Sequence, residues 1–176
     1  MPAELRFDEI LRVLLRNEVE FIVVGGIAAI LQGSPLTTED VDVVYLASEE
    51  NFDRLAKALG ELEAHYLDPG GRHIEPDASR LATAKIHLLK TRCGRIDALR
   101  TVGKDLAFQD LVGNTRMFDV ADLRVRVLDL ATIIATKEYA DRPKDRYQLL
   151  FLRQLQAEIQ RLKTESPGGL PLSPRP

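Results

Sequence analysis

Two aspartates stand one residue apart in a β-branched stretch, and carboxylates in that arrangement can bind a divalent metal. Asp40 and Asp42 alternate with Val41 and Val43, and side chains two positions apart in a strand project from the same face. Two carboxylates on one face of a buried strand repel each other and lose hydration unless a cation compensates them. The pattern therefore predicts a metal site, and an exposed edge strand with solvated acids is the alternative.

A glycine pair precedes these aspartates. Gly25 and Gly26 follow a short apolar run. Glycine lets the backbone approach a ligand closely, and free amides at a helix N-terminus favour an anionic phosphate. The alternative is an ordinary tight turn between a strand and a helix. Neither a Walker A lysine nor a G-x-G-x-x-G pattern follows, so the P-loop and dinucleotide-binding folds are poorly supported.

A third acid interrupts another apolar run. Asp97 lies within residues 95–99, which are expected to form a strand. If this strand lies beside the strand of Asp40 and Asp42, three carboxylates converge. Such a trio can hold two Mg²⁺ ions, one that activates an attacking hydroxyl and one that bridges a triphosphate and its leaving pyrophosphate. Alternatively, Asp97 is a salt-bridged or turn-facing acid.

Cationic residues follow later in the chain. Lys137 lies in an expected helix, and Arg142, Lys144 and Asp145 flank Pro143 after it. Positive charge near a triphosphate would neutralise the charge that develops on the leaving group. For any one of these residues, a solvated basic surface is the simpler explanation.

Taken in order, these features resemble the nucleotidyltransferase superfamily that shares the DNA polymerase β catalytic fold. Within this superfamily they are similar to the minimal nucleotidyltransferase-like group that includes the AbiE toxins of toxin–antitoxin systems. Its pattern is a glycine pair after a strand, Thr-x-Asp-x-Asp, a lone strand aspartate, a helical lysine and Arg-x-Lys-Asp. The matching residues are Gly25-Gly26, Thr38-Glu39-Asp40-Val41-Asp42, Asp97, Lys137 and Arg142-Pro143-Lys144-Asp145.

This resemblance implies a Mg²⁺-dependent transfer of a nucleoside monophosphate from an NTP to an acceptor hydroxyl. Asp40 and Asp42 would hold the metals, and Asp97 would complete the site and help to activate the acceptor. The nucleotide would be bound by a further set of residues: Gly25, Gly26, Thr38, Lys137, Arg142 and Lys144. Asp145 would orient one of the last two of these cations.

Two positions depart from the family pattern. An arginine usually lies two residues before the threonine of Thr-x-Asp, where this chain has Leu36, and an acid usually occupies the position of Gln148. The first departure affects the contact with phosphate or the choice of substrate, and the second affects the structure of the last helix.

The sequence does not specify the acceptor. The resemblance favours tRNA or another RNA, and a cognate antitoxin protein, as partners besides the NTP. A basic surface formed by Arg142, Lys144, Arg146 and Arg153 would suit a polyanion. Two alternatives stay open: a nucleotidyltransferase that modifies a small molecule such as an antibiotic, and a non-catalytic nucleotide- or partner-binding module of the same fold.

Hydrophobic periodicity predicts the elements that must position these residues. Helices are expected at residues 4–17 and 26–32, from Glu49 onward, from Asp129 to Tyr139 and from Pro143 onward. Strands are expected at residues 20–24, 41–46, 85–90, 95–99, 117–118 and 124–128, with a loop at residues 68–82. Ser48 and Asp129 are suitable N-caps.

We expect an α/β (α+β) fold, a small mixed sheet of nucleotidyltransferase type with packed helices. A catalytic domain is predicted at residues 1–128, a helical C-terminal extension at residues 129–165 and a disordered tail at residues 166–176.

The composition narrows the class of protein further. A net charge of −3 argues against a general polyanion binder. The single Cys93 excludes an internal disulfide, and no histidine has metal-ligand spacing with it. The N-terminus lacks a signal pattern, and no apolar run is long enough to span a bilayer, so a cytoplasmic location without membrane contact is expected.

Overall fold

The central sheet joins strands that are far apart in the sequence. The computed structural model describes residues 5–165. The strands of its main sheet are β1 (Phe21–Val24), β2 (Asp40–Tyr45), β3 (His65–Tyr66), β4 (Ile86–Thr91), β5 (Gly94–Leu99), β8 (Thr115–Val120) and β9 (Leu123–Leu128). They form a mixed seven-stranded sheet in the order β3-β4-β5-β2-β1-β9-β8. The pairs β2–β5 and β1–β9 are parallel, and the other neighbours are antiparallel.

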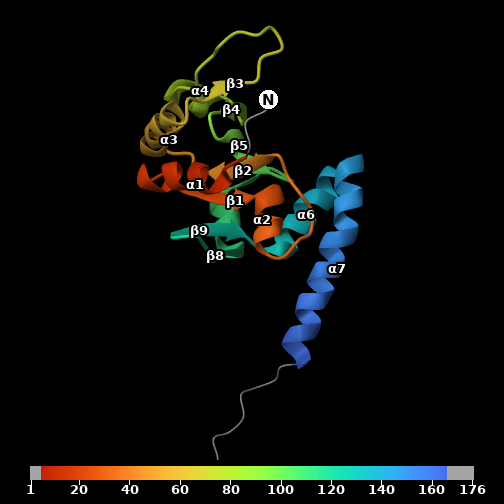
Figure 1. Ribbon diagram of the computed structural model, residues 1–176. Coiled ribbons are helices and arrows are strands. Elements are labelled where there is room, and N and C mark those ends of the chain that lie inside the picture. Colours follow the sequence, from red (N-terminus) through yellow and green to blue (C-terminus); the bar gives the residue numbers. More distant parts are fainter. Residues whose placement is uncertain (1–4, 166–176) are drawn as a thin grey trace, which may run out of the picture.

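Helices cover both faces of this sheet (Figure 1). Their bounds are α1 (Phe7–Arg16), α2 (Gly25–Leu31), α3 (Glu49–Glu61), α4 (Ala78–Thr83), α5 (Phe108–Leu111), α6 (Leu130–Ala140) and α7 (Pro143–Glu165), with a 3₁₀ turn η1 at Val112–Asn114. In Figure 1, α1 and α3 lie on one side of the sheet, and α2 and α6 lie on the other with α7 packed outside α6. A ribbon of two short strands, β6 (Thr101–Val102) and β7 (Leu106–Ala107), follows β5.

Strand alternation decides which residues face which layer. On β2, Val41 and Val43 are fully buried, whereas Asp40 and Asp42, which alternate with them, are only partly buried. The aspartates face α2, since Gly25 at the start of that helix lies directly against Asp42. The valines therefore face α1 and α3, where most of the apolar core lies, and the acids are left on the face that remains partly open.

The predicted fold class is confirmed, and most predicted elements are present with small shifts at their ends. The hairpin predicted around Gly94 is formed by β4 and β5. The side chains of Ser48 and Asp129 cap α3 and α6, as predicted, by accepting backbone hydrogen bonds. Pro143 begins the last helix.

The loop predicted at residues 68–82 is partly wrong, because α4 begins inside it. This short helix is held by tertiary hydrogen bonds: the Tyr45 hydroxyl donates to the Leu81 carbonyl at 2.9 Å, and the Arg100 guanidinium donates to the Ala82 carbonyl at 2.8 Å.

The sequence did not predict the short strands β3, β6 and β7. The tail predicted at residues 166–176 lies outside the described residues, and the domain boundaries remain a prediction.

A buried polar network explains the histidine nearest the sheet centre. His87 is fully buried, and its ring nitrogens lie 2.7 Å from the Tyr66 hydroxyl and 3.1 Å from the Tyr45 hydroxyl. Burial lowers its pKa and favours the neutral ring. Its neighbours in β4, Ile86 and Leu88, face the opposite way. His87 is therefore structural.

Among the described residues, no helix is both long enough and apolar enough to cross a lipid bilayer.

Candidate active site

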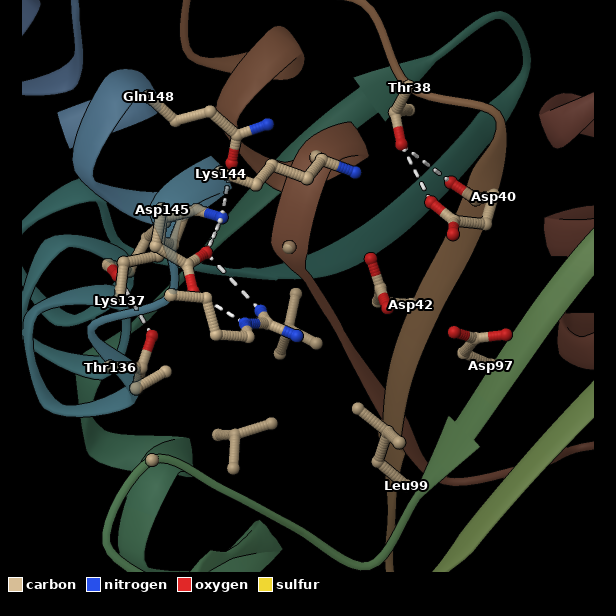
Figure 2. Close-up of a pocket in the computed structure, with 18 of the residues that line it drawn as sticks. Thr38, Asp40, Asp42, Asp97, Leu99, Thr136, Lys137, Lys144, Asp145 and Gln148 are labelled. Atoms are coloured by element: carbon tan, nitrogen blue, oxygen red, sulfur yellow. Dashed lines mark hydrogen bonds and ion pairs between the residues drawn. The ribbon is translucent and has the colours of Figure 1, made fainter. Parts of the chain in front are cut away.

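The three predicted acids lie on one face of the sheet. In the parallel pair of β2 and β5, Asp42 is directly opposite Asp97, and Asp40 lies two residues earlier on β2. All three line a pocket of about 540 Å³ between the sheet and the helices α2, α6 and α7. Figure 2 shows the three carboxylates pointing into this pocket, opposite the side chains of Lys137 and Lys144.

The acids disfavour one another's charge. Burial raises the pKa of Asp42 to about 7, and the charges of Asp40 and Asp97 add to this effect, while a hydrogen bond from the Gly26 backbone and the charge of Lys137 oppose it. Burial, with the charge of Asp40, also raises the pKa of Asp97 to about 6, although Arg95 opposes the shift. A cation placed among these carboxylates would relieve both burial and repulsion.

One carboxylate oxygen is left without a partner. Asp97 Oδ1 is buried and accepts no hydrogen bond within residues 5–165, which is costly for a charged group. By contrast, the Thr38 hydroxyl donates to Asp40 Oδ1 at 2.8 Å and so orients that side chain. Thr38 was predicted to bind nucleotide, and the contact that it makes here is with Asp40.

These acids fit a magnesium ion that the substrate would help to bind. In the described part of the chain, no group of three or more His, Cys, Asp or Glu side chains could hold a metal ion, so the three acids do not form a complete three-carboxylate site. Mg²⁺ is usually held by one or two carboxylates together with substrate phosphates rather than by a complete protein cage. The orphaned oxygen of Asp97 and the raised pKa of Asp42 match that incomplete kind of site.

The glycine pair brings helix α2 against the segment that runs from Thr38 to Asp42. Gly25 has a φ of +62°, and a Cβ there would overlap Asp42 Oδ2 and lie 2.7 Å from Asp42 Cγ. A Cβ at Gly26 would lie 2.6 Å from Thr38 Cβ. Both glycines are thus required by close approach. Their predicted contact with phosphate stays a prediction.

The opposite wall is a network of charges around a buried acid. Asp145 is 1% exposed at its side chain, and its oxygens lie 3.2 Å from Lys137 Nζ and 2.6 Å from Arg142 Nε. Gln148 Oε1, in the position where an acid was expected, accepts from Lys137 Nζ at 2.7 Å. Of the two cations that Asp145 was predicted to orient, it binds Arg142. Lys144 lines the pocket and forms no ion pair within residues 5–165.

Sequence reasoning missed two parts of this pocket. It did not identify Gln148 as a partner of Lys137, since that contact joins two helices across a break. It also missed an apolar wall to which Ile86, Leu88 and Leu99 contribute. A signal for the wall existed, because Leu99 is two residues after Asp97 in the same strand and must share its face.

The substitution Asp145→Asn tests the charge network. We expect the free energy of unfolding to fall by about 2–3 kcal/mol at pH 7, because two cations lose their buried partner. Although burial alone would raise the pKa of Asp145, the Arg142 hydrogen bond and the Lys137 charge outweigh it, and the pKa is lowered. The stabilisation is therefore present above the ordinary pKa of 3.8 and lost as the pH falls below it. Urea unfolding between pH 3 and pH 7 measures both effects.

Asp141→Asn is the matched control for this substitution. Asp141 pairs with Arg146 at 2.6 Å, but both side chains are exposed, and exposed pairs contribute at most about 1 kcal/mol. Asn also tolerates the left-handed conformation of residue 141. Equal losses from the two substitutions would contradict a special role for Asp145.

Comparison with known proteins identifies the fold. No family model matches the sequence, and no curated protein matches it. Among solved structures, the lincosamide antibiotic adenylyltransferase LnuA with bound lincomycin matches with a TM-score of 0.57 at 14% identity, over 85% of this chain and 95% of that chain. The solution structure of the antibiotic-resistance factor ANT(2'')-Ia matches with a TM-score of 0.55 at 12% identity, over 90% and 91% of the two chains. Its crystal structure with adenylyl-2''-tobramycin gives 0.55 at 13% identity, over 90% and 95%. The chain therefore has the fold of these nucleotidyltransferases.

Proposed function

We propose that this protein transfers a nucleoside monophosphate from an NTP to an acceptor hydroxyl, with Mg²⁺ as cofactor. The observation that carries the proposal is the convergence of Asp40, Asp42 and Asp97 on one sheet face, with a buried oxygen of Asp97 unpaired. Retaining three acids that repel one another costs stability, and a catalytic metal site gives a reason for that cost.

In this proposal Asp40 and Asp42 hold Mg²⁺, with Thr38 fixing the orientation of Asp40. A bound ion would supply charge neutralisation and Lewis acidity at the phosphates. Asp97 accepts the proton of the acceptor hydroxyl. Its buried Oδ1 has no hydrogen-bond partner among residues 5–165 and is therefore open to accept that proton.

The new bond joins the acceptor oxygen to the α-phosphorus of the NTP, and the protein promotes it by holding the two reactants in place. The acceptor oxygen attacks the α-phosphorus, the bond from that phosphorus to the bridging oxygen breaks, and pyrophosphate leaves with the electron pair. Lys137, Arg142 and Lys144 stand on the opposite wall, where they would neutralise the triphosphate and the leaving group. Gly25 and Gly26 would let the phosphates approach the backbone of α2.

Nucleotide binding is the first test. Calorimetric titration with each of the four NTPs should give heat and thermal stabilisation only with Mg²⁺ present, because the acids must be compensated before a triphosphate can approach. Lys144→Ala should weaken binding while leaving the fold intact, since Lys144 is exposed at the pocket edge. No heat with any NTP would favour a non-catalytic partner-binding module.

The acceptor defines two versions of this function. The sequence resemblance supports a toxin that modifies tRNA and pairs with an antitoxin. The similar solved structures support modification of a small molecule, since LnuA is an antibiotic adenylyltransferase and ANT(2'')-Ia was solved with an adenylylated tobramycin. Incubation with labelled NTPs and, separately, total tRNA, cellular protein or small molecules distinguishes these versions.

A further inference from the structure

One wall of the candidate active site is apolar and open. Leu88 on β4 is the register neighbour of Asp97, and Ile86 is the register neighbour of Leu99, so these side chains continue the sheet face beyond the acids. Ile86 is 60% exposed and Leu88 is 42% exposed, and both line the pocket that contains Asp97. Exposed apolar side chains gathered beside a polar site are typical of a surface that a ligand covers.

The short ribbon of β6 and β7 bounds this apolar wall. Val102 and Gly103 line the same pocket. Gly103 lies so near α6 that a Cβ there would be 3.1 Å from Thr136 Cγ2. The ribbon therefore lies against α6, and its residues line the pocket beside the apolar side chains of the sheet. From Ile86 to Gly103, Asp97 is the one charged residue that lines the pocket.

The cations expected to attract a polyanion are largely neutralised. Arg146 pairs with Asp141 and Arg153 pairs with Glu138, each at 2.6 Å. Arg142 pairs with Asp145 at the same distance. Three of the four cations of the predicted basic surface are therefore paired with acids. The fourth, Lys144, lines the pocket with Lys137 opposite the three carboxylates, where the triphosphate would be.

We infer that the acceptor is a small, uncharged, hydroxyl-bearing molecule whose apolar side packs on Ile86, Leu88 and Leu99. This inference rests on the proposed function and specifies its substrate class. The apolar wall begins beside Asp97, so a ligand packed on it presents a hydroxyl to the carboxylate that accepts the proton. Arg95 and Lys90 lie on the same sheet face as Asp97 but do not line the pocket, so a polyanionic acceptor inside the pocket would cover apolar side chains there.

A pair of glucosides tests the inference directly. Octyl β-D-glucoside, below its micelle-forming concentration, and methyl β-D-glucoside carry the same sugar hydroxyls and differ in the length of the alkyl chain. Titration monitored by methyl NMR should show the octyl compound binding at least about ten-fold more tightly, since burial of each methylene adds to affinity. The shifted methyl groups should be those of Ile86, Leu88 and Leu99.

Variants locate the binding surface. Ile86→Ser and Leu88→Ser should each weaken binding of the octyl compound by about five-fold or more. Leu67→Ser is the matched control, because Leu67 is also 42% exposed but does not line the pocket. Equal binding of the two glucosides, or equal weakening by Leu67→Ser, would overturn the inference. So would a wild-type dimer in solution that Leu88→Ser dissociates, because a second copy would then cover this wall.

A transfer assay separates the inference from the function on which it rests. Labelled NTPs should modify the octyl compound more efficiently than total tRNA, and Leu88→Ser should raise the KM for that compound while Mg²⁺–NTP binding stays unchanged. Label in tRNA alone would overturn the substrate class and leave nucleotidyl transfer standing. Glucoside binding in a protein that binds no NTP would instead overturn the proposed function.

Discussion

Asp42→Asn should abolish nucleotidyl transfer and at the same time stabilise the protein. The loss of activity should reach about 1,000-fold or more, because in the proposed mechanism Asp42 holds the metal and so contributes several kcal/mol to stabilisation of the transition state. The free energy of unfolding should rise at neutral pH, because the substitution removes a charge that burial and two neighbouring acids disfavour. Opposite effects on activity and stability are expected where a site is strained for function.

The size and pH dependence of this stabilisation follow from the pKa of Asp42. A pKa raised from 3.8 to about 7 corresponds to roughly 4 kcal/mol, which is an upper limit because water and side chains relax around the charge. Below pH 3.8 the carboxyl is protonated in both the folded and the unfolded state, so the variant gains nothing. The gain should grow as the pH rises from 3.8 and be complete above about 7.

Urea unfolding at pH 4 and pH 8 measures this difference, with a label-transfer assay for activity. Asp119→Asn is the control, since Asp119 is an exposed strand acid outside the pocket. The wild-type protein should also gain thermal stability on addition of Mg²⁺ with NTP, and the Asp42→Asn variant should gain much less. An active Asp42→Asn variant would remove the basis of the proposed mechanism.

The relation between the three acids shows how far sequence reasoning reaches. Alternation in residues 40–45 established that Asp40 and Asp42 share a face, because the side-chain period of a strand is fixed at two residues. It could not establish that Asp97 lies opposite Asp42, since the pairing of β2 with β5 joins segments separated by α3 and β4. From the sequence, the three acids could be expected to converge only if their two strands were neighbours, and the structure shows that β2 and β5 are neighbours.

The other misses have physical causes of the same kind. The strands β3, β6 and β7 have two residues each, too few for any periodicity. Helix α4 depends on hydrogen bonds from Tyr45 and Arg100, which are distant in sequence. The ion pairs that neutralise Arg146 and Arg153 depend on the path of the chain between α6 and α7. Tertiary contacts decided each of these features, and local sequence carries little information about them.

Gly25→Ala should destabilise the protein and disable the site, because Gly25 and Asp42 compete for the same space. An added Cβ would overlap Asp42 Oδ2 and lie 2.7 Å from Cγ and 3.0 Å from Cβ of that short side chain, which has little freedom to move on its strand. The φ of +62° adds backbone strain. We expect a loss of about 2–4 kcal/mol in unfolding free energy and a roughly 100-fold loss of activity from the displaced carboxylate.

A double-mutant cycle separates the two causes of that loss. Asp42→Ala removes the oxygen and Cγ that the new methyl group would meet and leaves only Cβ, at 3.0 Å. In that background Gly25→Ala should therefore cost little more than the backbone strain, about 1–2 kcal/mol. Gly60→Ala is the matched control, because Gly60 lies in α3 with nothing within 4 Å of an added Cβ. That substitution should raise stability by about 0.5–1 kcal/mol through helix propensity. If Gly25→Ala costs the same in both backgrounds, the glycine is needed only for its backbone conformation, and the close approach of α2 to Asp42 has no energetic consequence.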